Sequence, residues 1–122
     1  MGGSGMSATI VLPFPPSSLS GHAKGHWRKK ASATAMYRET AYCLTPAALR
    51  AVFTPSSGDI RIHIQFTPPN KRGDRTNFPN RFKAGLDGIA DALGVNDARF
   101  LPSYEFCEPK APGCVRVTLE AA

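Results

Sequence analysis

The sequence predicts a small α+β fold, in which about four strands form a mixed sheet and two helices pack against it. Residues 59–66, DIRIHIQF, alternate apolar and polar side chains as a half-buried strand does. Residues 79–93 repeat apolar side chains at helical spacing and are followed by Gly94. Short apolar runs near both ends add further strands, so the predicted order is strand, helix, strand, helix, strand, strand.

The 122 residues can build one hydrophobic core. Residues 1–5, MGGSG, are interpreted as a cloning remnant ahead of Met6, and residues 6–122 as a single domain. Neither a signal peptide nor a membrane span is recognisable, which favours a cytoplasmic protein. The three cysteines form no CxxC pair, which favours reduced thiols over a disulfide framework or a zinc knuckle.

The first half of the chain predicts one strand and one long helix. Residues 8–12, ATIVL, form a strand that ends in a proline-rich turn. Residues 17–30 are expected to be a polar loop and a first candidate for ligand contact. A helix is predicted over residues 32–44, followed by a shorter helical turn over residues 46–52.

The second half predicts a helix and a hairpin. In the helix over residues 79–93, Phe82, Leu86, Ile89 and Leu93 share one stripe. Pro79 suits the first turn, and Asn77 is a capping candidate. Residues 103–107 and 114–119 are predicted to be two strands joined by the turn EPKAPG.

The charge of the chain favours a polyanionic partner. The formal net charge is +6, and the residues up to Gly58 contain six Lys or Arg but one acid, Glu39. In the first loop, basic side chains are expected to contact phosphates while Trp27 stacks on a base or wedges into a junction. A solvated loop with Trp27 folded back on the core is an equal alternative. The residues expected to contact DNA are Lys24, Trp27, Arg28, Lys29, Lys30, Lys71, Arg72, Arg75 and Arg81.

Acidic residues surround the second predicted helix. Asp74 precedes it within the basic turn KRGDRTN, and Asp97 follows its end. Lys83, Asp87 and Asp91 recur at intervals of four, so they project from one side of the helix.

A carboxylate cluster of this kind could hold Mg²⁺ or Mn²⁺ through oxygen ligands. The ion would polarise a phosphodiester and activate water, while Lys83 would stabilise charge developing on the phosphoryl group. The alternative is plain ion pairing, of Lys83 with Asp87 on the helix surface and of Asp74 with a neighbouring arginine.

The order of these motifs resembles that of the RusA-type Holliday junction resolvases, small homodimeric endonucleases of phages and prophages. The likeness covers nearly all of residues 8–119, and its strength lies in the order and spacing of the motifs. Four segments carry it: VLPFPPS at 11–17, KGHWRKKASATAMYRETAY at 24–42, DRTN at 74–77 with KAGLD at 83–87, and GVND at 94–97.

The resemblance implies a RusA-like fold and a Mg²⁺-dependent (or Mn²⁺-dependent) enzyme that cuts four-way DNA junctions symmetrically as a homodimer, in DNA recombination and repair. It implies that Asp74 and Asp97 are the first and last metal ligands, with Asp87 a further candidate. It also implies that Lys83 is the catalytic lysine and that Asn77 accompanies Asp74 in catalysis.

Three features depart from the family pattern. Thr76 stands where the family has a second aspartate, Asn96 replaces the first acid of the closing pair, and three extra residues separate Asn77 from Lys83. Loss of a carboxylate weakens a Mg²⁺ site. A non-catalytic module of the same fold that binds branched DNA is therefore the alternative, and an inhibitor of a host enzyme acting through its basic face is a third possibility.

Overall fold

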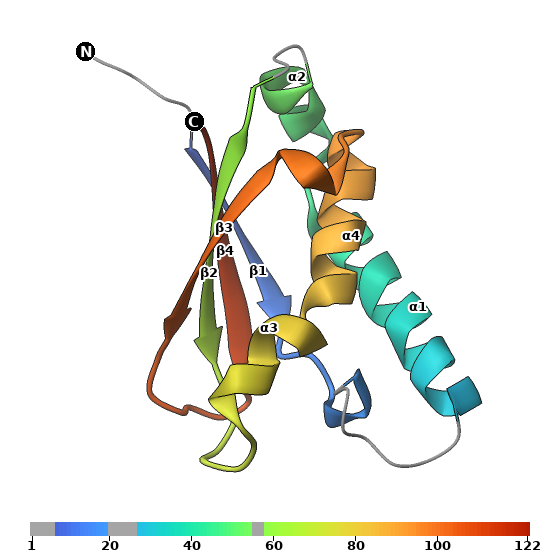
Figure 1. Ribbon diagram of the computed structural model, residues 1–122, viewed down its shortest axis with the longest axis vertical. Helices are drawn as coiled ribbons and strands as arrows, with labels where there is room; N and C mark the ends of the chain where they lie inside the picture. Colours follow the sequence, from blue (N-terminus) through green and yellow to red (C-terminus); the bar gives the residue numbers. More distant parts are fainter. Residues whose placement is uncertain (1–6, 20–26, 55–57) are drawn as a thin grey trace.

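A four-stranded mixed sheet forms one layer of the molecule, in the order β1–β4–β2–β3 (Figure 1). The computed structural model describes residues 7–19, 27–54 and 58–122. β4 (Cys114–Ala121) lies between β1 (Ser7–Pro13) and β2 (Ile60–Thr67) and is antiparallel to both, whereas β3 (Phe100–Phe106) runs parallel to β2. The predicted α+β class and mixed sheet are confirmed.

The predicted hairpin of the last two strands is wrong, because β2 separates β3 from β4. The chain passes from β2 to β3 through helices, and such a crossover connection joins parallel strands. The chain then returns so that β4 fills the position between β1 and β2. β3 is therefore an edge strand.

The alternation in β2 confirms the predicted half-buried strand. Ile60, Ile62, Ile64 and Phe66 are all buried, and the intervening side chains are not. Their neighbours on β4 include Leu119, Val117 and Val115, which are also buried, so one face of the sheet is apolar. The buried residues of sheet and helices form one core cluster.

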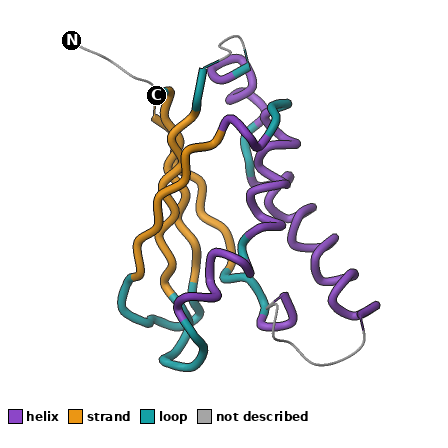
Figure 2. The backbone as a smooth tube through the Cα atoms, in the orientation of Figure 1, coloured by secondary structure: helices purple, strands orange, loops and turns teal. Residues whose placement is uncertain are grey.

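The second layer consists mainly of α1 (Trp27–Leu44) and α4 (Lys83–Leu93), which lie side by side along the same face of the sheet (Figures 1 and 2). α1 begins at Trp27, so the predicted loop over 17–30 is wrong in its last residues. No glycine or proline follows Gly25 there, and the Lys and Ala residues of WRKKA favour helix. The predicted turn over 46–52 is confirmed as η2 (Ala47–Leu49) and α2 (Arg50–Phe53).

The predicted helix over residues 79–93 is divided at Phe82 into α3 (Phe78–Arg81) and α4. The buried Phe82 ring lies against Tyr37 and Phe66, with centroids 6.0 and 5.9 Å away. Gly94 ends α4 with a φ of 67°, a left-handed conformation that suits glycine, as predicted. Among the described helices, none is both long and apolar enough to cross a membrane.

Candidate functional site

Lys83 draws together two acids that are distant in sequence. Its Nζ donates to Asp87 Oδ1 and to Asp97 Oδ2, each at 2.7 Å. The two carboxylates therefore lie no further apart than twice that distance. These hydrogen bonds raise the pKa of Lys83, and the bond from Lys83 lowers the pKa of Asp97.

The reversal of the chain after α4 places Asp97 beside the helix. After Gly94 the chain turns back, with Val95 N donating to Ala90 O at 3.1 Å. Asn96 then caps η4 (Asp97–Arg99), because its Oδ1 accepts from Ala98 N at 2.8 Å. Asn96, which stands where the resemblance expects an acid, thus has a capping role.

Asp91, one turn further along α4 than Asp87, pairs with a different cation. Arg38 of α1 donates from Nε and Nη2 to the two carboxylate oxygens of Asp91, at 2.7 and 3.0 Å. Arg38, Asp87, Asp91 and Asp97 line one open cleft of about 310 Å³. The cleft therefore holds three acids, with a basic side chain bonded to each.

Asp74 is not part of this cleft. It caps η3 (Arg75–Asn77), accepting from Thr76 N at 3.0 Å and from Thr76 Oγ1 at 2.7 Å. The extra turn of α3 lies between this cap and Lys83. Within residues 7–19, 27–54 and 58–122, no group of three or more His, Cys, Asp or Glu side chains is placed to hold a metal ion. The structure thus brings Asp87 and Asp97 together and leaves Asp74 elsewhere.

Asn77 lies beside α3 and is half-buried. It stands at the N-cap of α3, but its side chain makes no capping hydrogen bond there. The capping function expected of it is met one turn earlier by Asp74.

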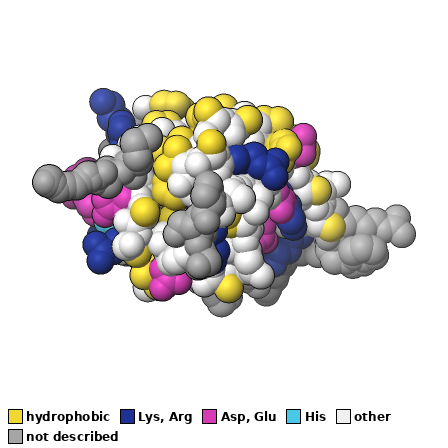
Figure 3. All heavy atoms as spheres, turned by 90° about the horizontal axis from the view of Figure 1, so that it is seen from above, with side chains coloured by type: hydrophobic (Ala, Val, Ile, Leu, Met, Phe, Trp, Pro, Cys, Tyr) yellow, Lys and Arg dark blue, Asp and Glu magenta, His cyan; other side chains and the backbone are white. Residues whose placement is uncertain are grey.

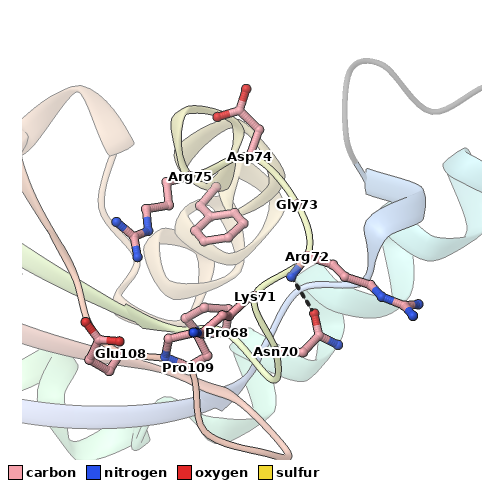
Figure 4. Close-up of a pocket in the computed structure, with 10 residues that line it drawn as sticks. Pro68, Asn70, Lys71, Arg72, Gly73, Asp74, Arg75, Glu108 and Pro109 are labelled. Carbon is pink, nitrogen blue, oxygen red and sulfur yellow. Dashed lines mark hydrogen bonds between the residues drawn. The ribbon is translucent and has the colours of Figure 1, made fainter.

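The loop after β2 carries three exposed basic side chains around a cleft of about 630 Å³. Figure 4 shows Arg72 and Arg75 directed to opposite sides of the loop, and the Asp74 carboxylate directed away from Asn70 and Glu108. The loop lies at the end of the sheet where α3 begins (Figure 1). The end that carries α2 and the last residues of β4 instead shows basic and acidic side chains interspersed (Figure 3). The exposed basic residues of the loop are Lys71, Arg72 and Arg75.

Arg81 is fixed in place beside two aromatic rings. Its guanidinium lies 5.1 Å from the ring centroid of Phe14 and 5.5 Å from that of Phe78. Its Nη2 donates to Pro15 O at 2.6 Å. Partial burial lowers the pKa of Arg81.

The remaining predicted DNA contacts lie at the start of α1. Trp27, Arg28, Lys29 and Lys30 belong to its first turns, and Lys30 is exposed. Lys24 lies outside the described residues, as do residues 1–5.

Comparison with known proteins places the chain in a family. No family model matches it. It is 35% identical over 103 residues to an uncharacterized protein from Xylella fastidiosa (strain Temecula1 / ATCC 700964), an alignment that spans 83% of this chain and 67% of that protein. The chain belongs to the family of that protein.

One polar network was missed at the sequence level. His63 lies on the sheet face away from the helices, where Nδ1 is 2.7 Å from Ser103 Oγ and Nε2 is 3.0 Å from Glu105 Oε1. The hydrogen bond from His63 lowers the pKa of Glu105. The network ties the edge strand β3 to β2, and only the parallel register, which pairs His63 with Ser103, could have revealed it.

Proposed function

We propose that this protein is a metal-dependent endodeoxyribonuclease that hydrolyses phosphodiesters in Holliday junctions or other branched DNA. The observation that carries the proposal is the convergence of Asp87 and Asp97 on the Nζ of Lys83. Two carboxylates and one lysine, gathered at one point, are groups that the RusA resemblance implies for phosphodiester hydrolysis.

The donor set suits a hard divalent cation. Mg²⁺ is commonly bound by one or two carboxylates, with waters and substrate phosphates completing its shell. Asp87 and Asp97 would hold it, because both already direct oxygens at one cationic centre, the Lys83 ammonium. The chemistry supplied by a bound Mg²⁺ or Mn²⁺ is the polarisation of the phosphodiester.

Lys83 would then contact a phosphate group of the substrate. Its raised pKa keeps the side chain protonated at neutral pH. More than half of the side chain is exposed, so its ammonium can turn from the carboxylates to a phosphate oxygen. A fixed positive charge at that point stabilises the negative charge that develops during hydrolysis.

The charge distribution supports a DNA substrate. The net charge of +6 raises the local concentration of a polyanion. Lys71, Arg72 and Arg75 are exposed on the loop before α3 and can contact phosphates. Acting as a homodimer, two such sites would produce the paired cuts that junction resolution requires.

Cleavage of a synthetic four-way junction with labelled arms, over a range of Mg²⁺ and Mn²⁺ concentrations, tests the proposal. Asp97→Asn should lower the cleavage rate about 100-fold or more, since even residues behind a metal ligand affect metal affinity by roughly 10- to 100-fold. Junction binding should persist. The matched control is Asp59→Asn, at an exposed position on another part of the molecule. Equal cleavage by the two variants would reject the proposed role of Asp97.

The second candidate function is a non-catalytic module that binds branched DNA. The observation that favours it is the placement of Asp74, whose carboxylate bonds to Thr76 and lies outside the cleft of Asp87 and Asp97. Under this alternative the wild-type protein binds the junction but does not cut it at any metal concentration.

Thr76→Asp separates the two candidate functions. A gain of cleavage in this variant, from an inactive wild-type protein, would indicate a metal site that has decayed. Metal-dependent symmetric nicking by the wild-type protein would instead reject the non-catalytic alternative.

A further inference from the structure

A cleft of about 370 Å³ opens between the turn after β1, the loop after β2 and Pro112. We call it the proline cleft. It has two arginines, Arg72 and Arg81, and none of the described residues that line it is acidic. Its other walls are largely apolar and include Phe14, Pro16 and Pro69.

The Arg81 side chain is preorganised to bind an anion. Its guanidinium lies over Phe14 and Phe78, and its Nη2 donates to Pro15 O. These contacts fix the side chain, so binding costs little further conformational entropy. Gly73 lies beside it, with a φ of 91° that favours glycine in this turn.

Arg72 reaches the same cleft from the loop. Its backbone N–H donates to Asn70 Oδ1 at 2.9 Å, which shapes the turn. Its side chain is directed to the side of the loop opposite Arg75 and Glu108 (Figure 4). Two arginines from separate segments therefore line one cavity, without an acid among the described lining residues, and such an arrangement favours a phosphate group.

The apolar walls of the cleft favour an unpaired DNA strand over a duplex. A phosphate on the surface of a duplex could reach the arginines, but its base stays stacked within the double helix. An unpaired nucleotide can also place its base or sugar against the proline and phenylalanine side chains. A cleft of this volume is within the range of small-ligand sites.

We infer that the proline cleft binds a phosphodiester and the adjoining nucleoside of an unpaired DNA strand. The inference rests on the proposed function and deepens it, because forks and flaps, which belong to the branched DNA proposed as substrate, carry unpaired nucleotides. The cleft is separate from the one that Asp87 and Asp97 share, so strand binding and cleavage can be tested apart.

Fluorescence anisotropy with a labelled oligothymidylate and a labelled blunt duplex tests the inference. Arg72→Gln should weaken oligothymidylate binding and reduce the slope of log K against log salt concentration by about 0.7, as expected for one lost contact to a single strand. Duplex affinity should change less. The control is Arg61→Gln, an exposed arginine on the sheet face away from the helices.

A second pair of variants tests the cavity without touching an arginine. Ser17 is an exposed residue that lines the cleft at the start of η1 (Ser17–Leu19). Ser17→Asp places a negative charge there and should weaken oligothymidylate binding about tenfold, whereas Ser17→Asn should leave it unchanged. Thermal unfolding of each variant confirms that it is folded.

A competition experiment shows whether the apolar walls of the proline cleft contribute to binding. Thymidine monophosphate should displace the oligonucleotide at lower concentration than inorganic phosphate does. Equal competition would overturn the assignment of a nucleoside to the cleft.

Unchanged oligothymidylate affinity and salt slope in both Arg72→Gln and Ser17→Asp would overturn the inference as a whole. Junction cleavage that is lost in Asp97→Asn would still support the proposed function in that case. If the wild-type protein binds neither single strand, duplex nor junction, the inference and the proposed function both fail.

Discussion

Replacing Gly88 with alanine should force α1 and α4 apart. Gly88 lies at a close approach of α4 to α1, because a Cβ there would be 2.8 Å from Ala41 Cβ and in direct conflict with the carbonyl oxygen of Arg38. A backbone atom cannot rotate away as a side chain can. The added methyl group therefore has to be accommodated by movement of the helices.

The size of the effect follows from two opposing contributions. Overpacking costs about 1–3 kcal/mol, and the upper end applies because the obstacle is backbone. Alanine favours helix over glycine by about 1 kcal/mol. The free energy of unfolding should thus fall by about 2 kcal/mol, and the Tm by about 8 °C in a domain of this size.

Urea unfolding followed by circular dichroism measures the change. Ala35→Gly, at an exposed position of α1, is the matched control and isolates the helix-propensity contribution of about 1 kcal/mol. If Gly88→Ala were as stable as the wild-type protein while Ala35→Gly showed its expected loss, the close approach of α1 and α4 would be refuted.

Three other predictions concern the core and the ion pair. Phe66→Ala removes a fully buried ring and should lower the free energy of unfolding by about 3–5 kcal/mol, measurable by urea titration; a loss below 1 kcal/mol would contradict the packing. Tyr37→Phe leaves Pro13 O without its 2.6 Å donor and should cost about 1–3 kcal/mol in the same assay; no loss would indicate that water replaces the hydroxyl. Because Lys83 lowers the pKa of Asp97, this acid adds stability above its ordinary pKa that is lost as the pH falls through its lowered value. Asp97→Asn should therefore reduce the loss of stability on acidification, and an unchanged pH profile of the Tm would contradict the pairing.

Local patterns predicted the elements of the fold well. The alternation in β2 is set by the period of a strand, and the end of α4 by the conformational freedom of Gly94. The strand order could not be predicted in the same way, since pairing depends on partners that are distant in sequence. The division at Phe82 likewise reflects contacts of its ring with Tyr37 and Phe66.

Only those parts of the candidate site that depend on local spacing could be predicted from the sequence. The pairing of Lys83 with Asp87 follows from their i,i+4 spacing on a helix and was one of the two interpretations of the sequence. Asp97 reaches them because the chain reverses directly after α4. The position of Asp74 depends on how α3 and the preceding loop fold, which no local pattern determines.

Titration of the ¹⁵N-labelled protein with Mn²⁺, followed by NMR, tests the central claim most directly. A paramagnetic ion broadens the signals of amides close to it, so binding at Asp87 and Asp97 should broaden the amide signals of these residues first. The broadening should disappear in Asp97→Asn and persist in Asp59→Asn. Signals around Asp87 and Asp97 that stay sharp while those around another group of acids broaden would contradict the proposed metal site.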